Sequence, residues 1–125
     1  MRIGTDIVEV SRVKTAIDRT GKAFLERVYT ETEIGYCELG KSRRKYESYA
    51  ARFAAKEAFS KAIGTGIGEN AHLNEIEVLN LDNGKPVVRL YGETKEYFEA
   101  NFGGNEIDIS LSHTSKLALA TVVVG

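Results

Sequence analysis

The amino-acid sequence predicts an α+β fold, a mainly antiparallel sheet with one long helix packed on it. The hydrophobic patterns follow the order strand, several helices, hairpin, helix, hairpin, and not the alternating strand–helix order of a parallel sheet. Asn83-Gly84, between two apolar runs, is a strong signal of an antiparallel hairpin. The helix pattern from about Tyr46 to Ile63 carries alanines along one side, which lets a helix lie close to a sheet.

The first forty residues are expected to form one strand and then short helices. Residues 2–10 are rich in isoleucine and valine and predict the strand. Ser11 is the expected N-cap of the first helix. A second helical turn is expected at residues 24–28, and residues 30–33 form a capping-box pattern for a helix that ends near Gly40.

The rest of the chain is expected to contain the long helix, four strands and a final helix. The basic run at residues 41–45, ahead of the long helix, is interpreted as a solvated segment. The strands are expected at residues 75–81, 86–91, 106–112 and 117–124. The last helix is expected at residues 93–102, between the two hairpins.

Length and charge narrow the class of protein. The 125 residues suit one domain, residues 1–125, with a single core. A net charge of −1 gives no overall electrostatic attraction to nucleic acid or to an anionic membrane. Cys37 is the only cysteine, which fits a reducing compartment, and no apolar run approaches membrane-spanning length. We expect a cytoplasmic protein with no nucleic-acid or membrane partner.

Two carboxylates are candidates for a metal site. Asp6 interrupts a strand pattern in which aspartate is uncommon, so it either caps a strand end or belongs to a functional site. Glu57 lies on the long helix, with Lys61 one turn later, and the simpler interpretation is a surface ion pair between the two. The alternative is that a strand carboxylate and a helix carboxylate together bind Mg²⁺, which takes one or two carboxylates plus phosphates and waters.

Cations and glycines accompany Glu57 on the same part of the chain. Arg52, Lys56 and Lys61 are expected to place positive charge on its side of the helix, which suits a pyrophosphate, although a solvated charged face is the commoner result. The glycine-rich loop at residues 64–68 follows the helix, so it is first a helix stop. Its amides could also form an anion-binding nest.

His113 follows a predicted strand and is either a base or phosphate donor, or a histidine with a local turn contact. Other chemistries lack support. The chain has no G-x-S-x-G elbow, and two distant histidines with one cysteine do not make a zinc site.

Three stretches together resemble the short, holo-acyl-carrier-protein synthase type of 4′-phosphopantetheinyl transferases. They are residues 4–10 (GTDIVEV), residues 52–62 (RFAAKEAFSKA) with the loop at 64–68, and residues 110–114 (SLSHT). Their order and spacing over nearly the whole chain make the match specific.

The resemblance implies that family's fold and reaction. The reaction transfers the 4′-phosphopantetheine group from coenzyme A to a serine of apo acyl carrier protein and releases adenosine 3′,5′-bisphosphate, in fatty acid biosynthesis. The resemblance implies Mg²⁺ held by Asp6 and Glu57, with Lys61 as a further catalytic residue. It also implies a homotrimer with sites between neighbouring subunits.

The resemblance also assigns the residues that contact the two substrates. Acidic carrier protein is expected to dock near Arg12. The expected coenzyme A-binding residues are Arg52, Lys61, Gly64, Gly66, Ser112, His113 and Thr114. Ser112, His113 and Thr114 are placed near the nucleotide end, with His113 as a possible catalytic helper. Lys61 and the glycine loop are placed at the phosphates.

Two other functions fit an α+β chain of this size. A small oligomeric acyl-CoA thioesterase would need no metal and no protein acceptor. A non-catalytic module would bind coenzyme A or a nucleotide without modifying anything. The Asp6 and Glu57 motifs favour the transferase.

Overall fold

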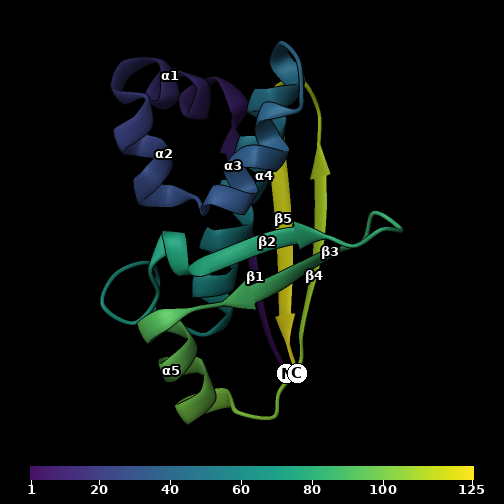
Figure 1. Cartoon of the computed structure of the whole chain (residues 1–125). Helices are drawn as coiled ribbons and strands as arrows, with labels where there is room; N and C mark the ends of the chain where they lie inside the picture. The colour runs from purple at the N-terminus through teal and green to yellow at the C-terminus, as the bar shows by residue number, and fades with distance from the viewer.

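The computed structural model describes residues 1–125 and confirms the α+β class, with two antiparallel sheets and five α-helices (Figure 1). The first half comprises β1 (Arg2–Glu9), α1 (Val10–Thr20), α2 (Lys22–Val28), α3 (Glu31–Glu38) and α4 (Arg43–Ala62). The second half comprises the short 3₁₀ helix η1 (Leu73–Glu75), β2 (Ile76–Asn80), β3 (Pro86–Leu90), α5 (Gly92–Phe102), β4 (Ile107–His113) and β5 (Leu117–Val124).

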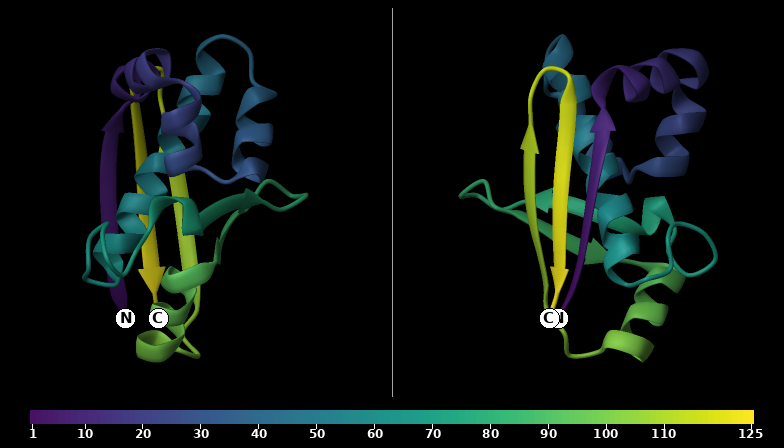
Figure 2. Two further views of the ribbon diagram at one scale, coloured as in Figure 1. Left: turned by 60° about the vertical axis from the view of Figure 1, so that its left-hand side comes forward. Right: turned by 180° about the vertical axis from the view of Figure 1, so that it is seen from behind.

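The main sheet has the strand order β1-β5-β4, so both ends of the chain lie in one sheet. The register pairs Asp6 with Ala120 on one side of β5, and Ser110 with Thr121 on the other. The hairpin β2–β3 forms a separate two-stranded sheet that crosses the main sheet (Figure 2). Because Arg2 of β1 pairs with Val124 of β5, the two termini lie close together.

The helix α4 is the centre of the core and packs on one face of the main sheet. Its alanines are the reason that it fits there, because they let the helix backbone approach the strands. Ala54, Ala55, Ala58 and Ala62 are all buried. Phe59 from the same helix and Val122 from β5 complete the contact between the two layers.

Two helix starts differ from the prediction. α1 begins at Val10, and its N-cap position is taken by Glu9 without a side-chain hydrogen bond, so Ser11 is not the cap. α4 begins at Arg43, so part of the basic run expected to be a solvated segment forms the first turn of the long helix. The predicted capping box is confirmed, because the Thr30 hydroxyl accepts from the Glu33 amide and the Glu33 carboxylate accepts from the Thr30 amide.

The other face of the main sheet carries no helix. Ile3 and Ile7 on β1, and Leu117 and Leu119 on β5, are large apolar side chains left exposed there. None of the helices combines the length and the apolar character that crossing a bilayer requires.

Candidate active site

Gly4 determines how closely β1 approaches α4. A Cβ atom at Gly4 would lie 2.0 Å from the carbonyl oxygen of Ala58 and 2.6 Å from the amide nitrogen of Ala62, distances that no side chain tolerates. Strand side chains alternate, so Asp6 points from β1 toward the same helix. The glycine two residues earlier is therefore what lets the Asp6 carboxylate reach the last turns of α4.

Asp6, Glu57 and Lys61 form one cluster at this contact. The Lys61 ammonium donates to Asp6 Oδ1 at 2.8 Å and to the Thr5 carbonyl at 3.1 Å. Burial, and then the nearby Asp6 carboxylate, raise the pKa of Glu57, while Lys61 acts in the opposite direction. The structure thus brings the two predicted carboxylates together. It contradicts the simpler interpretation of Glu57, because Lys61 pairs with Asp6 across the fold and not with Glu57 along the helix.

The expected positive stripe beside Glu57 does not form. Lys56 is fully buried and pairs with the equally buried Glu33 at 2.7 Å. Its ammonium also donates to the carbonyl oxygens of Leu73 and Ile76. Arg52 is buried as well, so of the three predicted cations only Lys61 lies at the carboxylates. The prediction was wrong here because hydrophobic neighbours and distant acceptors cannot be inferred from helical spacing.

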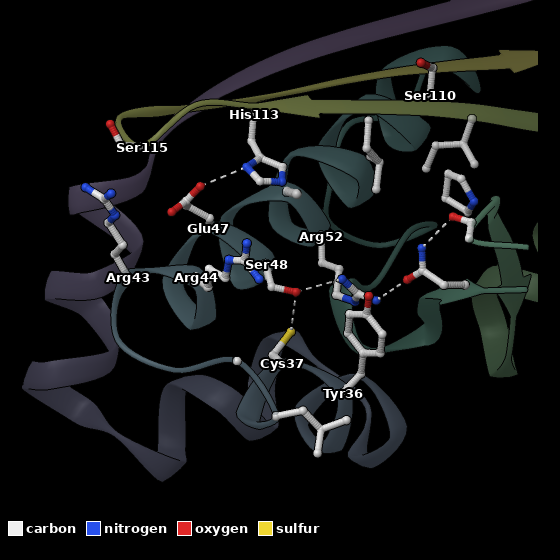
Figure 3. A pocket seen from close by; sticks show the side chains of 18 residues that line it. Tyr36, Cys37, Arg43, Arg44, Glu47, Ser48, Arg52, Ser110, His113 and Ser115 are labelled. Carbon is white, nitrogen blue, oxygen red and sulfur yellow. Dashed lines mark hydrogen bonds and ion pairs between the residues drawn. The ribbon is translucent and has the colours of Figure 1, made fainter. Parts of the chain in front are cut away.

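A pocket of about 1020 Å³ opens between α3, α4, the hairpin β2–β3 and strand β4 (Figure 3). Its lining is rich in cations: Arg43, Arg44 and Arg52 come from α4, and His113 comes from the end of β4. Glu47 is the only carboxylate in the lining. The charge of the pocket suits an anionic ligand.

Arg52 is the clearest anion-binding group of the pocket. The residue is only 4% exposed, and its polar and aromatic contacts include no carboxylate. The guanidinium donates to Ser48 Oγ at 3.1 Å and to Asn80 Oδ1 at 2.7 Å, and it lies 4.3 Å from the Tyr36 ring (Figure 3). Its Nε atom has no hydrogen-bond partner. A buried cation without a counter-ion, with a donor to spare, is suited to an anionic ligand.

His113 enters the pocket next to Glu47, and its Nδ1 atom lies 3.0 Å from a Glu47 carboxylate oxygen (Figure 3). The two neighbours predicted with it do not line the pocket. Ser112 is exposed on β4, and the Thr114 hydroxyl accepts from the amides of Lys116 and Leu117, which closes the β4–β5 turn. The roles predicted for Ser112 and Thr114 in coenzyme A binding stay predictions.

The glycine loop at the end of α4 uses its amides within the chain. The Gly64 amide donates to the Lys61 carbonyl, and the amides of Thr65 and Gly66 donate to the Ser60 carbonyl. Gly64 and Gly66 have φ values of 82° and 66°, which explains the glycines at these positions. Since these three amides already have acceptors, they form no open anion nest in this structure, and phosphate binding by the loop stays a prediction.

The two parts of the predicted site lie on different sides of α4. Arg52 and Glu57 are five residues apart, which is roughly 140° around the helix axis. A second, mainly apolar pocket of about 430 Å³ includes Ile7, the residue after Asp6. It is lined by Arg12 from α1, Phe24 from α2 and Phe53, which is one turn before Glu57. The predicted docking residue thus lies beside the metal candidates and away from the cationic pocket.

Several residues of the site were missed from the sequence. Glu47, Ser48 and Asn80 hold His113 and Arg52 in place, but nothing in their local patterns pairs them. Arg43 and Arg44 were noticed only as part of a basic run. The one signal for them was the position of that run, roughly two turns ahead of Arg52 along the chain.

Comparisons with known proteins agree on one family. The family model described as the 4′-phosphopantetheinyl transferase superfamily matches residues 2–120. A holo-[acyl-carrier-protein] synthase of Ruminiclostridium cellulolyticum is 54% identical, over 99% of this chain and 91% of its own. A solved holo-[acyl-carrier-protein] synthase from Neisseria meningitidis is 32% identical with a TM-score of 0.89, and covers 99% of this chain and 97% of its own.

A second solved holo-[acyl-carrier-protein] synthase, from Helicobacter pylori, is in complex with coenzyme A. It is 34% identical with a TM-score of 0.83, over 98% of this chain and 99% of its own. The match of the family model to nearly the whole chain, the similarity of sequence to the curated relatives and the shared fold lead to one assignment. This chain belongs to the 4′-phosphopantetheinyl transferase superfamily.

Proposed function

We propose that this protein is a holo-[acyl-carrier-protein] synthase that moves the 4′-phosphopantetheine group from coenzyme A to a serine of apo acyl carrier protein, in fatty acid biosynthesis. The observation that carries the proposal is the Asp6–Glu57–Lys61 cluster, which Gly4 brings together from two distant motifs. Names and bound ligands of the relatives support the same reaction. The unpaired, buried Cys37 supports a cytoplasmic location.

Asp6 and Glu57 are the proposed ligands of Mg²⁺. Their residue types fit, since Mg²⁺ in phosphate-processing sites is bound by one or two carboxylates together with substrate phosphates. Burial raises the pKa of Glu57, and the nearby Asp6 carboxylate raises it further, so the two proposed ligands lie near each other. When bound, Mg²⁺ would neutralise charge on the pyrophosphate of coenzyme A.

The residues of the chain contribute positioning and proton transfer. The carrier serine oxygen forms a bond to the β-phosphorus of coenzyme A, and the bond from that phosphorus to adenosine 3′,5′-bisphosphate breaks. The serine proton passes to Glu57 or to a water beside it. Lys61 supplies positive charge to the phosphates.

The cationic pocket is the proposed binding site for the nucleotide end of coenzyme A. Arg52 offers a buried guanidinium with no counter-ion, and Arg44 and His113 add donors at the same opening. Coenzyme A carries a 3′-phosphate on its ribose, which provides a counter-ion for the Arg52 guanidinium. Ser112, Thr114, Gly64 and Gly66 remain part of the proposed coenzyme A site.

A homotrimer would unite the two parts of the site. The metal cluster and the cationic pocket lie on different sides of α4 in one chain, so a complete site needs a neighbouring copy if one coenzyme A spans both. The exposed Ile3, Ile7, Leu117 and Leu119 on the open face of the main sheet supply apolar surface for such contacts. Arg12, at the apolar pocket beside Glu57, is the proposed contact for the acidic carrier.

The first test is Glu57→Gln, which keeps the shape of the side chain and removes its charge. We expect at least a 100-fold loss of turnover, because a metal ligand and a proton acceptor are lost together. Asp6→Ala should lower the activity and the metal dependence in parallel. The measurement is the rate at which apo carrier gains the phosphopantetheine mass. A normal rate with Glu57→Gln would overturn the site assignment.

A further inference from the structure

The ion pair of Lys61 with Asp6 has a consequence for the order in which ligands bind. The ammonium lies 2.8 Å from Asp6 Oδ1, so a cation already neutralises one of the two proposed metal ligands. Besides this contact, Lys61 donates only to the Thr5 carbonyl, at 3.1 Å. Its side chain is 51% exposed, whereas that of Asp6 is 17% exposed. The Lys61 side chain is therefore free to move, and the Asp6 side chain is not.

The carboxylates alone make a poor site for a divalent cation. No group of three histidine, cysteine, aspartate or glutamate side chains converges anywhere in the structure. Asp6 and Glu57 must supply the whole protein contribution, and one of them is occupied by Lys61. Since Mg²⁺ gives up its water shell reluctantly, two carboxylates with a competing ammonium give weak binding.

The formal charges of the Asp6–Glu57–Lys61 cluster also indicate weak binding of a divalent cation alone. Two carboxylates and one ammonium leave one net negative charge. A divalent cation alone would make the cluster positive while Lys61 remains there. A divalent cation together with a pyrophosphate diester, which carries two negative charges, returns the cluster to its starting charge. Binding both ligands together therefore leaves the net charge of the cluster unchanged, whereas binding the cation alone changes it by two units.

We propose that Lys61 is the counter-ion of Asp6 in the ligand-free enzyme and exchanges Asp6 for the coenzyme A pyrophosphate, so that metal and coenzyme A bind as a cooperative pair. The inference rests on the proposed function. Lys61 then has two alternative acceptors, the Asp6 carboxylate and the coenzyme A pyrophosphate. The metal ion displaces Lys61 from Asp6 and coenzyme A attracts it, so both ligands favour the contact with the pyrophosphate. By linkage, coenzyme A tightens metal binding by the same factor by which the metal tightens coenzyme A binding.

The test measures Mn²⁺ binding to the full chain by the electron paramagnetic resonance signal of free Mn²⁺, with and without coenzyme A. Carrier protein is left out, so no turnover occurs. Wild type should bind Mn²⁺ weakly alone and at least tenfold more tightly with coenzyme A. Lys61→Met should bind Mn²⁺ alone more tightly than wild type, by up to about fivefold, the value of one exposed ion pair. Its gain from coenzyme A should be smaller than that of wild type.

Lys95→Met is the matched control, because Lys95 forms an exposed pair with Glu99 on α5, away from the site, and it should behave like wild type. A second readout follows the nitrogen-15 signal of the Lys61 ammonium, which should shift when Mg²⁺ and coenzyme A are added together. Equal Mn²⁺ affinity of wild type and Lys61→Met without coenzyme A, or an unchanged ammonium signal, would overturn the exchange and leave the proposed function intact. Absence of Mn²⁺ binding to wild type even with coenzyme A would remove the metal site itself, and the exchange with it.

Discussion

Two lysines on α4, Lys56 and Lys61, both pair with a carboxylate, yet their surroundings are opposite. Lys56 and its partner Glu33 are both 0% exposed, and the ammonium has three acceptors within the protein. Lys61 is half exposed and pairs with a partly exposed aspartate. A buried pair cannot change partners without leaving a charge unpaired in a medium of low polarity, whereas an exposed pair can. The comparison assigns stability to Lys56 and ligand exchange to Lys61.

The largest expected effect is on folding, from Lys56→Met. Removal of the ammonium leaves Glu33 buried without its partner, and we expect a loss of about 3–5 kcal/mol in the free energy of unfolding. Urea denaturation measures it. Lys61→Met is the matched control and should cost less than about 1 kcal/mol. Similar losses of unfolding free energy for Lys56→Met and Lys61→Met would contradict the different roles given to the two lysines.

The next effect concerns the cationic pocket, which lies on the side of α4 away from Lys61. Arg52→Gln should raise the KM for coenzyme A by about 10- to 100-fold, since hydrogen bonds to a charged group contribute about 1.5–3 kcal/mol. The KM for coenzyme A without its 3′-phosphate should change much less. An equal change for both substrates would argue against a phosphate at Arg52.

The same variant tests whether the site is shared between copies. Arg52→Gln and Asp6→Asn are each expected to be poorly active alone. Subunits of the two variants, once exchanged, should recover part of the activity, because some interfaces then combine an intact cluster with an intact pocket. A mixture no more active than its components would place both parts of the site within one chain.

A smaller effect is expected at Gly4, on which the exposed cluster depends. Gly4→Ala must push β1 away from the Ala58 carbonyl, at a cost of about 1–3 kcal/mol, and should lower activity by moving Asp6. Gly35→Ala is the control, because a Cβ atom there meets nothing within 4 Å. Thermal unfolding and the transfer rate measure the two effects. A Gly4→Ala enzyme as stable and active as wild type would contradict the role given to this contact.

The smallest effect concerns pH and Glu57. A carboxyl whose pKa is raised on folding favours the folded state below its unfolded-state pKa, and this contribution is lost as pH rises through the folded-state pKa. Ionised Glu57 therefore costs stability at neutral pH, and Glu57→Gln removes that cost. Without metal, the variant should melt about 1–3 °C above wild type at pH 7, and the difference should shrink below about pH 4. A difference in melting temperature between variant and wild type that does not change with pH would contradict a raised pKa of Glu57.

Much of the fold could be predicted from local patterns. Alternation along β4 and the Asn83-Gly84 turn are short-range signals, and the antiparallel hairpin and strand are where they were expected. The ends of helices were less predictable. Ser11 is a good capping residue, but β1 ends at Glu9 and α1 starts directly at Val10, so Glu9 takes the N-cap position.

The candidate site was predictable only in its motif residues. Residue type and position left Asp6 and Glu57 open to simpler interpretations, the resemblance favoured a shared metal site, and the structure brings the two residues together. The partners of the charged groups were not predictable, because they come from distant segments: Lys61 finds Asp6 from β1, and Lys56 finds Glu33 from α3. Helical spacing suggests partners within one helix, and here the tertiary contacts override it.

The measurement that tests the central claim most directly is the mass of an apo acyl carrier protein after incubation with this enzyme, coenzyme A and Mg²⁺. The account predicts that the carrier gains one phosphopantetheine group on its serine, and that a chelator added at the start prevents the gain. It also predicts release of adenosine 3′,5′-bisphosphate in equal amount. A carrier of unchanged mass under these conditions, or one modified at the same rate with the chelator present, would contradict the account.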